Sequence, residues 1–477
     1  MLRPQVDSTS ACVTLGKLRD FPRDAIECMR QLHQKHGTIA ALEEEGQRLI
    51  FAFGPDYNQR LLSDPNRFHS RFSAIRGPRN SAQRRLTCGL LSMNGEEHKR
   101  HRRLVMGPFQ KKSIDVYRES LVGLSEELVR DWRVGQVRDV FQDMTQFMLR
   151  VTSSVLFGFD VPELAHNIGR MTERWIAMNH EVGIGAFVSD QQATAGYGRL
   201  LAQGDALEAE IVKMIEHRRS GPPAGDVLSL LIGAHDDSGA GMTDAELIGQ
   251  AAVLFGAAHL TTANTLTWTL FLLAQHPEIA ADLYDELTGT LAGAAPSFEQ
   301  LDRLPLLDRV IKESMRVLPA SSYSQRTAAE PVELGPFRLA TGTPVVFSQF
   351  ITHHMPELFA DAERFRPQRW ETITPSPYAY LPFAAGPRMC IGASLAVMTL
   401  KIALSAVLQR YSLSMVAGSS ITGKVTSTML GPTQGMPMLV EPATAPRHWE
   451  PVVGNIHRLV TIDPAPDRSL GIRPRAA

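Results

Sequence analysis

The chain has few cysteines and no excess of either charge. Its four cysteines (Cys12, Cys28, Cys88 and Cys390) form no Cys-x-x-Cys pair, which argues against a disulfide framework or an iron–sulfur cluster and favours a reducing compartment. With 49 basic and 50 acidic residues the net charge is −1, so we expect no bulk attraction to nucleic acid. The N-terminus lacks the apolar core of a signal peptide or a membrane span, and we therefore expect a cytoplasmic protein without a membrane anchor.

The 477 residues show no internal repeat and no low-complexity tract. After Ser113 apolar residues recur mostly three and four positions apart, which predicts helices. Short runs typical of strands occur at residues 37–42, 48–53, 331–347 and 436–440. The pattern predicts a mainly helical α+β protein with small β-sheets.

One cysteine lies in a glycine-rich loop, Phe383-Ala-Ala-Gly-Pro-Arg-Met-Cys-Ile-Gly392. Gly386 and Gly392 permit a sharp turn and a close approach of the backbone to a flat group. Arg388 places a cation two residues before the sulfur of Cys390, where it can pair with a carboxylate or help to keep the sulfur ionised. A helix that begins after the loop would also favour the anion. The alternative is a buried structural cysteine in a turn.

Two further motifs precede this loop. Glu313 and Arg316 lie three positions apart in a helix that we expect to end before Pro319, so that the two side chains share a face. Arg369 follows in the proline-fixed segment Phe365-Arg-Pro-Gln-Arg-Trp370. A carboxylate can hold two guanidinium groups, because each presents a planar fork of donors. Taken alone, however, a Glu-x-x-Arg pair is usually a solvated helix face.

Cationic side chains also gather near residue 100. His98 and Arg102 are four positions apart and share a helix face. Arg326 follows the Glu-x-x-Arg helix by ten residues. Without other motifs, His98 and Arg102 would be read as part of a basic, solvated helix.

Residues 247–275 form a long, nearly uncharged run that would extend roughly 40 Å as one helix. A membrane-spanning helix is a weak alternative, because polar residues from His259 to Thr265 interrupt the apolar character midway. The run predicts a buried central helix.

Together these motifs resemble the cytochrome P-450 family, whose loop has the form Phe-x-x-Gly-x-Arg-x-Cys-x-Gly. All five specified positions are present, and the resemblance extends from about residue 15 to residue 442. It implies a single catalytic domain over residues 1–442, with heme between the central helix and the cysteine loop. We expect residues 443–477 to be an extension of unknown role, outside the common core.

The resemblance also implies a role for each motif. Cys390 would bind the iron of heme b (iron protoporphyrin IX), and Thr261 would act in catalysis. A buried ion network would comprise Glu313, Arg316 and Arg369. The residues expected to contact heme are His98, Arg102, Arg326, Arg388, Ala257, Ala258, Phe383, Gly386 and Gly392. By analogy the substrate pocket would include Leu86, Leu90, Leu91, Leu254, Ala320 and Ser324, and residues 183–196 would belong to a mobile lid.

The central helix departs from the family's Ala/Gly-Gly-x-Asp/Glu-Thr-Thr pattern. Residues 257–262 read Ala-Ala-His-Leu-Thr-Thr, so Thr261 is retained while Ala258 replaces glycine and Leu260 replaces the acid. In the family the threonine hydrogen-bonds dioxygen and the acid supports proton delivery, which leucine cannot do. Either water, a substrate hydroxyl or another side chain replaces the acid, or the enzyme uses peroxide or rearranges a substrate that already contains an oxygen–oxygen bond.

The resemblance implies a monooxygenase of secondary metabolism that inserts one oxygen atom from O2 into an apolar organic substrate, free or tethered to a carrier protein. Electrons would come from a separate ferredoxin or flavodoxin with its reductase. Five basic residues could dock such a partner or be a solvated face: Lys99, Arg100, Arg103, Lys111 and Lys112. The alternatives are a peroxygenase or isomerase on the same fold, and a non-catalytic heme-thiolate sensor.

Overall fold

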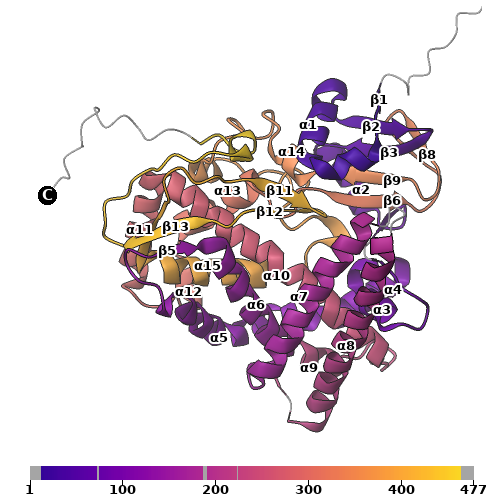
Figure 1. Ribbon diagram of the computed structural model, residues 1–477, viewed down its shortest axis with the longest axis horizontal. Coiled ribbons are helices and arrows are strands. Elements are labelled where there is room, and N and C mark those ends of the chain that lie inside the picture. Colours follow the sequence, from indigo (N-terminus) through magenta and orange to yellow (C-terminus); the bar gives the residue numbers. More distant parts are fainter. Residues whose placement is uncertain (1–11, 72–74, 186–190, 223, 463–477) are drawn as a thin grey trace, which may run out of the picture.

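The structure is a computed structural model that describes residues 12–71, 75–185, 191–222 and 224–462. Helices fill most of the molecule, and a β-rich part lies at the upper right of Figure 1. The α-helices are α1 Ala25–His36, α2 Pro55–Ser63, α3 Ala82–Leu86, α4 Gly95–Met106, α5 Lys111–Arg130, α6 Val140–Phe157, α7 Pro162–Gly185, α8 Gln191–Ser220, α9 Val227–Ile232, α10 Asp244–Gln275, α11 Pro277–Leu291, α12 Phe298–Leu301, α13 Pro305–Val317, α14 Gln349–His353 and α15 Ala393–Leu408. This confirms the predicted mainly helical α+β class.

The largest sheet has the strand order β1-β2-β3-β9-β6-β4. Its strands are β1 Val13–Leu15, β2 Ile39–Glu44, β3 Gln47–Ala52, β4 Phe68–Ser70, β6 Ser324–Ala328 and β9 Pro344–Phe347. The smaller sheets comprise β10 Tyr411–Met415, β13 Pro437–Pro442 and β5 Val137–Asp139; β11 Gly423–Thr426 and β12 Met429–Pro432; and β7 Val332–Leu334 and β8 Phe337–Leu339. The runs predicted at 37–42 and 48–53 form the β2–β3 hairpin, which follows α1.

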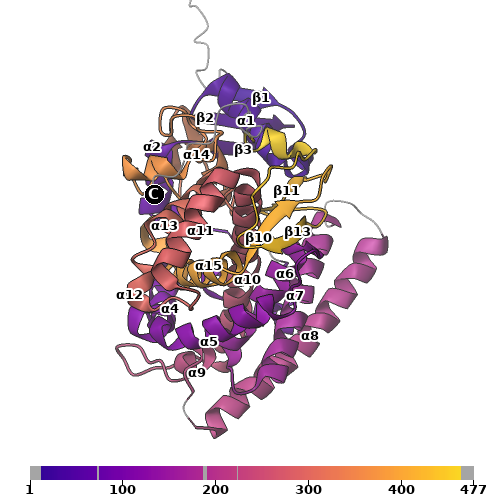
Figure 2. The ribbon, with the colours of Figure 1, turned by 90° about the vertical axis from the view of Figure 1, so that its left-hand side faces the viewer.

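The central helix α10 runs through the middle of the molecule (Figure 2). It begins with a capping box, in which the Thr243 side chain accepts from the Glu246 amide and the Glu246 side chain accepts from the Thr243 amide. It ends before Pro277, the first residue of α11. Most of its side chains are buried, which explains the uncharged sequence. Among the described residues, none of the helices combines the length and hydropathy that a membrane span requires.

Two helix boundaries predicted from the sequence are confirmed around the cysteine loop. Helix α13 ends at Val317, since Pro319 disfavours helical geometry at the residue before it. Helix α15 begins at Ala393, directly after the loop. The loop therefore leads directly into a helix whose residues from Met398 to Val407 are buried.

The described part of the C-terminal extension packs on the rest of the chain. Val452, Ile456, Leu459 and Val460 are buried and belong to the main hydrophobic core. These residues between 452 and 460 therefore pack against the preceding part of the chain, and the domain boundary at residue 442 stays a prediction. Residues 463–477 lie outside the described part of the chain.

Candidate functional site

A hydrogen bond across the cysteine loop and a close backbone contact hold its shape. The Cys390 amide donates to the carbonyl of Phe383 over 2.8 Å, which closes the loop on itself. Gly386 has φ +72°, in the left-handed region, and a Cβ built on it would lie 2.2 Å from the Leu62 carbonyl oxygen. Only glycine fits this position, as the sequence indicated. Gly392 differs, because its φ is −91° and a Cβ would meet only the Phe109 ring, at 4.0 Å.

Replacing Gly386 with alanine is therefore expected to destabilise the protein by roughly 2 kcal/mol or more, because the left-handed conformation and the Leu62 contact both oppose a Cβ. Thermal unfolding and the ratio of heme to protein measure the effect. Gly289→Ala is the matched control, since Gly289 lies within α11 and its Cβ would meet open space. Equal behaviour of the two variants would contradict the prediction.

The Cys390 residue is exposed on one side. Enclosure by the loop raises the pKa of its thiol, although the Gly392 amide and the Arg102 cation act in the opposite direction. The sequence suggested Arg388 as the cation that helps to ionise the sulfur. The structure assigns this contribution to Arg102, because the Arg388 guanidinium points instead at Asn94, 2.7 Å from its Oδ1. The protein alone thus favours the thiol, and a bound metal ion would be needed to keep the thiolate.

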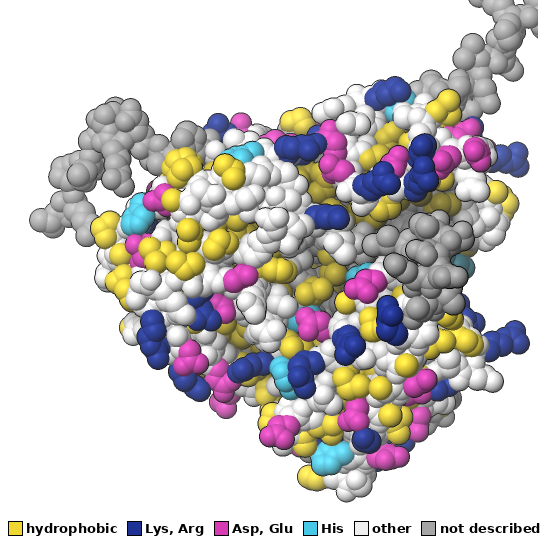
Figure 3. Space-filling model, viewed as in Figure 1, with side chains coloured by type: hydrophobic (Ala, Val, Ile, Leu, Met, Phe, Trp, Pro, Cys, Tyr) yellow, Lys and Arg dark blue, Asp and Glu magenta, His cyan; other side chains and the backbone are white. Residues whose placement is uncertain are grey.

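The middle of α10 presents small residues that the described part of the chain leaves exposed. Ala257 and Ala258 are exposed in a helix that is otherwise mostly buried. Thr261 is half-buried, and its hydroxyl donates to the Ala257 carbonyl over 2.8 Å. Figure 3 shows a recess near the middle of the molecule, below the β-rich part, with hydrophobic side chains inside it. A flat group can lie against this helix because methyl groups leave room for it.

Four cationic or potentially cationic side chains meet beside the loop. Burial, together with the charges of Arg388, Arg102 and Arg326, lowers the pKa of His98 to about 4. Burial and the charge of Arg388 lower the pKa of Arg326 to about 10. Arg388 shows a similar fall to about 10, caused by burial and by Arg102. We call His98, Arg102, Arg326 and Arg388 the cation cluster; the sequence predicted these same residues as heme ligands.

No carboxylate of the described residues forms an ion pair with the cation cluster. Arg102 donates to the Met389 carbonyl over 2.8 Å, and Arg326 donates to the carbonyl of its neighbour Gln325 over 3.0 Å. The Arg388 Nε is buried without a hydrogen-bond partner. Unpaired buried cations are costly, so the cluster requires an anion that the described chain does not supply. The two propionates of heme fit this requirement.

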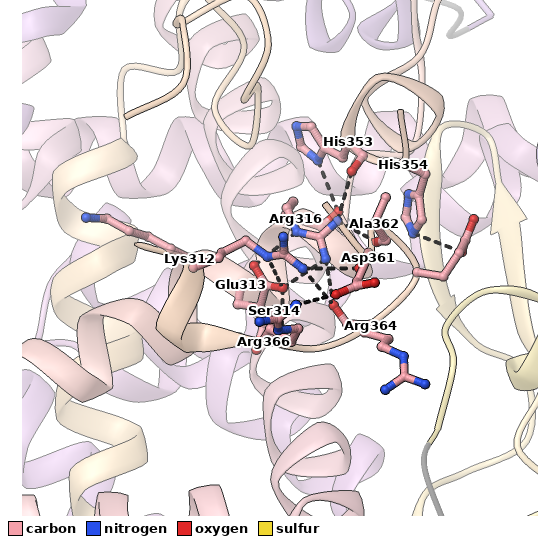
Figure 4. Close-up of polar contacts among 12 residues, drawn as sticks. Lys312, Glu313, Ser314, Arg316, His353, His354, Asp361, Ala362, Arg364 and Arg366 are labelled. Carbon is pink, nitrogen blue, oxygen red and sulfur yellow. Dashed lines mark hydrogen bonds and ion pairs between the residues drawn. The ribbon is translucent and has the colours of Figure 1, made fainter. Parts of the chain in front are cut away.

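Figure 4 shows the ion network built on Glu313, which joins segments that precede the cysteine loop in the sequence. Glu313 and Arg316 are fully buried, and the Arg316 Nη2 lies 2.8 Å from the Glu313 Oε1. The Arg369 Nε lies 2.9 Å from the same oxygen. Arg316 also donates to the carbonyls of His353, Ala362 and Arg364, over 2.7–2.9 Å. The network therefore joins α13 to the segment that leads towards the cysteine loop.

The six residues predicted for the substrate pocket differ in burial. Five are buried or half-buried: Leu86, Leu90, Leu254, Ala320 and Ser324. Leu91 is 41 % exposed. Of the predicted lid, residues 186–190 lie outside the described part of the chain. Their burial does not show that the six residues line a common cavity, so the pocket remains a prediction.

Leu260, which stands where the family has an acid, follows a buried histidine. Leu260 is half-buried, and the preceding His259 is buried with its Nε2 3.3 Å from Oε1 of Glu173 on α7. His259 lies on a different side of α10 from Thr261, because two positions correspond to about 200° of helical rotation. This pair therefore does not take the place of the acid beside Thr261.

The basic residues predicted to dock a redox partner are partly neutralised. Lys99 pairs with Glu96 over 2.6 Å and Arg103 with Asp237 over 3.0 Å. Arg100 contacts both Asp236 and Glu246, over 2.7 and 3.1 Å. Lys111 and Lys112 are exposed at the start of α5, and no salt bridge involves them within the described ranges. The net positive field of this face is weaker than the sequence indicated.

Sequence reasoning missed three side chains near the site. Asn94 accepts from Arg388 and from the Ser70 amide, and so links the cation cluster to β4. Trp370 donates to Glu313 Oε2 over 2.9 Å. Asn264, three residues after Thr261, donates to the Leu430 carbonyl over 3.2 Å. The Trp370 contact could have been expected from the aromatic position of its motif, whereas the others depend on long-range contacts.

An exposed cysteine in a glycine-containing loop, a central helix with exposed small residues, and cations without ion pairs beside the loop are together typical of a heme-thiolate protein. The sequence profile described as Cytochrome P450 matches residues 10–436, and the chain belongs to this family. The chain is 30% identical to cyclooctat-9-en-7-ol 5-monooxygenase of Streptomyces melanosporofaciens, over 81% of this chain and 84% of that protein. It is 29% identical to pentalenene oxygenase of Streptomyces avermitilis, over 72% and 78%.

Solved structures agree on the fold. The cytochrome P450DA heme domain superposes with a TM-score of 0.76 at 24% identity, covering 88% of this chain and 92% of that one. Retinoic acid bound cyanobacterial CYP120A1 gives 0.75 at 23% identity, covering 87% and 93%. The protein is a heme-binding oxidoreductase, a heme-thiolate monooxygenase that acts on apolar substrates.

Proposed function

We propose that this enzyme hydroxylates an uncharged cyclic alkene or alkenol, using O2 and electrons from a separate ferredoxin or flavodoxin system. The carrying observation is the similarity, over most of the chain, to two oxygenases whose names give an alkenol and an alkene as substrates. An apolar substrate also suits the predicted pocket, whose members are mostly alkyl side chains. The substrate is free in this proposal, and not tethered to a carrier protein.

In this proposal the cofactor is heme b, which supplies the reductive activation of O2 and the oxidation of the substrate. Cys390 holds the metal, and the cation cluster binds the two propionates. Ala257 and Ala258 leave space for the ring, and Phe383 and Gly386 hold the loop in place. The Thr261 hydroxyl donates to the Ala257 carbonyl in this structure, and it would donate to dioxygen when heme is bound.

Two exposed lysines support the redox partner in this proposal. Lys111 and Lys112 have no ion pair within the described ranges, and they can steer an acidic ferredoxin or flavodoxin to the start of α5. Four free cysteines support a cytoplasmic location. We further propose that residues 1–442 are the catalytic domain and that residues 443–477 assist it.

Spectral titration of the purified holoprotein tests the substrate class. Cyclic terpene alkenes and alkenols are expected to shift the heme absorption towards high spin, whereas fatty acids, steroids and macrocycles are not. A shift produced only by one of the latter classes would contradict the proposal. Silence across the whole panel would favour a carrier-tethered substrate instead.

Leu260→Glu restores the acid that the family pattern places before Thr261. We expect this variant to raise the product formed per electron consumed and to lower peroxide release, by up to about tenfold, because a positioned acid promotes proton transfer. Leu260→Gln is the matched control, since its amide is similar in size to a carboxyl but is not an acid. If neither variant changes the product formed per electron consumed, the missing acid does not limit proton delivery.

The same departure favours a second candidate function, a peroxygenase or isomerase. Leu260 cannot carry a proton, and a reaction that starts from peroxide needs no reductive proton delivery. Product formation with peroxide and without any reductant, at a rate equal to or above that of the reductant-driven reaction, would establish this alternative. A strict requirement for the reductant would exclude it.

A further inference from the structure

The segment of residues 451–461, which we call the C-terminal strap, lies beyond the last residue that the family profile matches. We propose that the strap positions one wall of the substrate pocket by holding the β11–β12 hairpin in place. The inference rests on the proposed function and on the predicted pocket that it uses, whose members Ala320 and Ser324 lie in this wall. Its parts are joined by a continuous series of hydrogen bonds, from the strap to the hairpin and from the hairpin to the wall.

The strap is fastened to the base of the hairpin by backbone and side-chain contacts. Asn455 bonds Gly423 in both directions, accepting from its amide and donating to its carbonyl, each over 2.8 Å. The Ile421 amide donates to the Val453 carbonyl over 2.7 Å. Gly454 has φ +111°, and a Cβ on it would lie 2.3 Å from the Ile421 carbonyl oxygen. The strap therefore follows the chain before β11 at a distance that only glycine allows.

The tip of the hairpin is bonded to the predicted wall. The Leu430 amide donates to the Ala320 carbonyl over 2.9 Å, and the Ser322 amide donates to the Thr428 carbonyl over 2.9 Å. Met429 forms a β-bridge with Ser321. Residues 428–430 thus form a short stretch of pairing with residues 320–322, so a displacement of the hairpin displaces this wall.

The hairpin is also bonded to α10. The Leu430 carbonyl accepts from the Asn264 Nδ2 over 3.2 Å and from the Trp268 Nε1 over 3.1 Å. Asn264 lies three positions after Thr261, so the two residues share a side of the helix. Position 430 therefore sets the separation between the wall and the catalytic part of α10.

The other end of the strap contacts a different part of the fold. The Arg458 Nη2 lies 3.0 Å from the Glu27 Oε2, and the Arg30 side chain donates to the Arg458 carbonyl over 2.9 Å. These contacts tie the strap to α1 and do not involve the hairpin. They provide a control in which the strap is weakened without loss of its bonds to Gly423.

The test compares Asn455→Ala with Arg458→Ala in the full-length holoprotein. The probes are 4-phenylimidazole, whose phenyl ring would extend from the heme towards the proposed pocket wall, and imidazole, which lacks this ring. We expect Asn455→Ala to weaken 4-phenylimidazole about fivefold and imidazole less than about twofold, since loss of the Gly423 bonds removes about 1 kcal/mol of positioning. Deuterium exchange at residues 423–432 becomes faster, and Arg458→Ala changes neither binding nor this exchange.

Three results would overturn the inference: unchanged exchange and binding in Asn455→Ala, equal weakening of both probes with loss of heme, or the same behaviour in Arg458→Ala. Each would leave the strap with a purely stabilising role. Neither probe depends on the natural substrate, so a wrong substrate class would not alter these results. Failure here and failure of the alkene proposal can therefore be distinguished.

Discussion

Replacing Cys390 with serine is expected to lower turnover by at least about two orders of magnitude, because the thiolate is the ligand that favours oxygen–oxygen bond cleavage. The loop itself is expected to remain folded. Its closing bond runs between the Cys390 amide and the Phe383 carbonyl, and its sharpest turn depends on Gly386. Neither feature uses the sulfur. The variant should therefore retain the fold and lose the chemistry.

The absorption spectrum of the reduced carbon monoxide complex shows whether the iron has a thiolate ligand. In the parent protein it is expected to show the long-wavelength Soret band of thiolate ligation, which Cys390→Ser lacks. Cys88→Ser is the control, since Cys88 is also a free, partly exposed cysteine. A parent protein without the band, or a Cys390→Ser variant that retains it, would assign the metal to another ligand.

Replacing Glu313 with glutamine has the largest effect expected on stability, a loss of about 3–5 kcal/mol. Glu313 is fully buried and receives Arg316, Arg369 and the Trp370 indole. Removing its charge leaves two buried guanidinium groups without a counter-charge. The carbonyls around Arg316 compensate only in part, because they carry no net charge.

Denaturant unfolding of the holoprotein, followed by helix content and by heme absorption, measures this loss. Glu96→Gln is the matched control, since Glu96 also pairs with a cation, Lys99, but its side chain is 87% exposed. The control is expected to unfold as the parent protein does, because solvent screens exposed pairs. A loss of similar size in both variants would mean that burial of the Glu313 network adds nothing to the free energy of unfolding.

The parts of the fold that depend on local patterns could be predicted from the sequence. The uncharged run of α10, the end of α13 before Pro319 and the start of α15 at Ala393 all follow from residues close in the chain. The cysteine loop was also recognisable, because its spacing is fixed by a turn that needs glycine at position 386.

The parts that depend on distant contacts could not be predicted. The Leu62 carbonyl that excludes a side chain at Gly386 is more than 300 positions away, and nothing near either residue indicates the meeting. Asp236 and Asp237 reduce the free charge of α4 through pairs that cross the fold. The packing of residues 452–460 could not be predicted, because their apolar residues do not repeat at the spacing of a helix or a strand.

The cation cluster also bears on how the cell accumulates this protein. Before heme arrives, the positive charges of Arg102, Arg326 and Arg388 repel one another at the edge of the site, and the free energy of that repulsion opposes local folding. A ligand that binds only the folded chain stabilises it in proportion to the logarithm of its free concentration. Cells short of heme are therefore expected to hold the chain in a loosened form that proteases degrade, so that the supply of the cofactor sets the abundance of the enzyme.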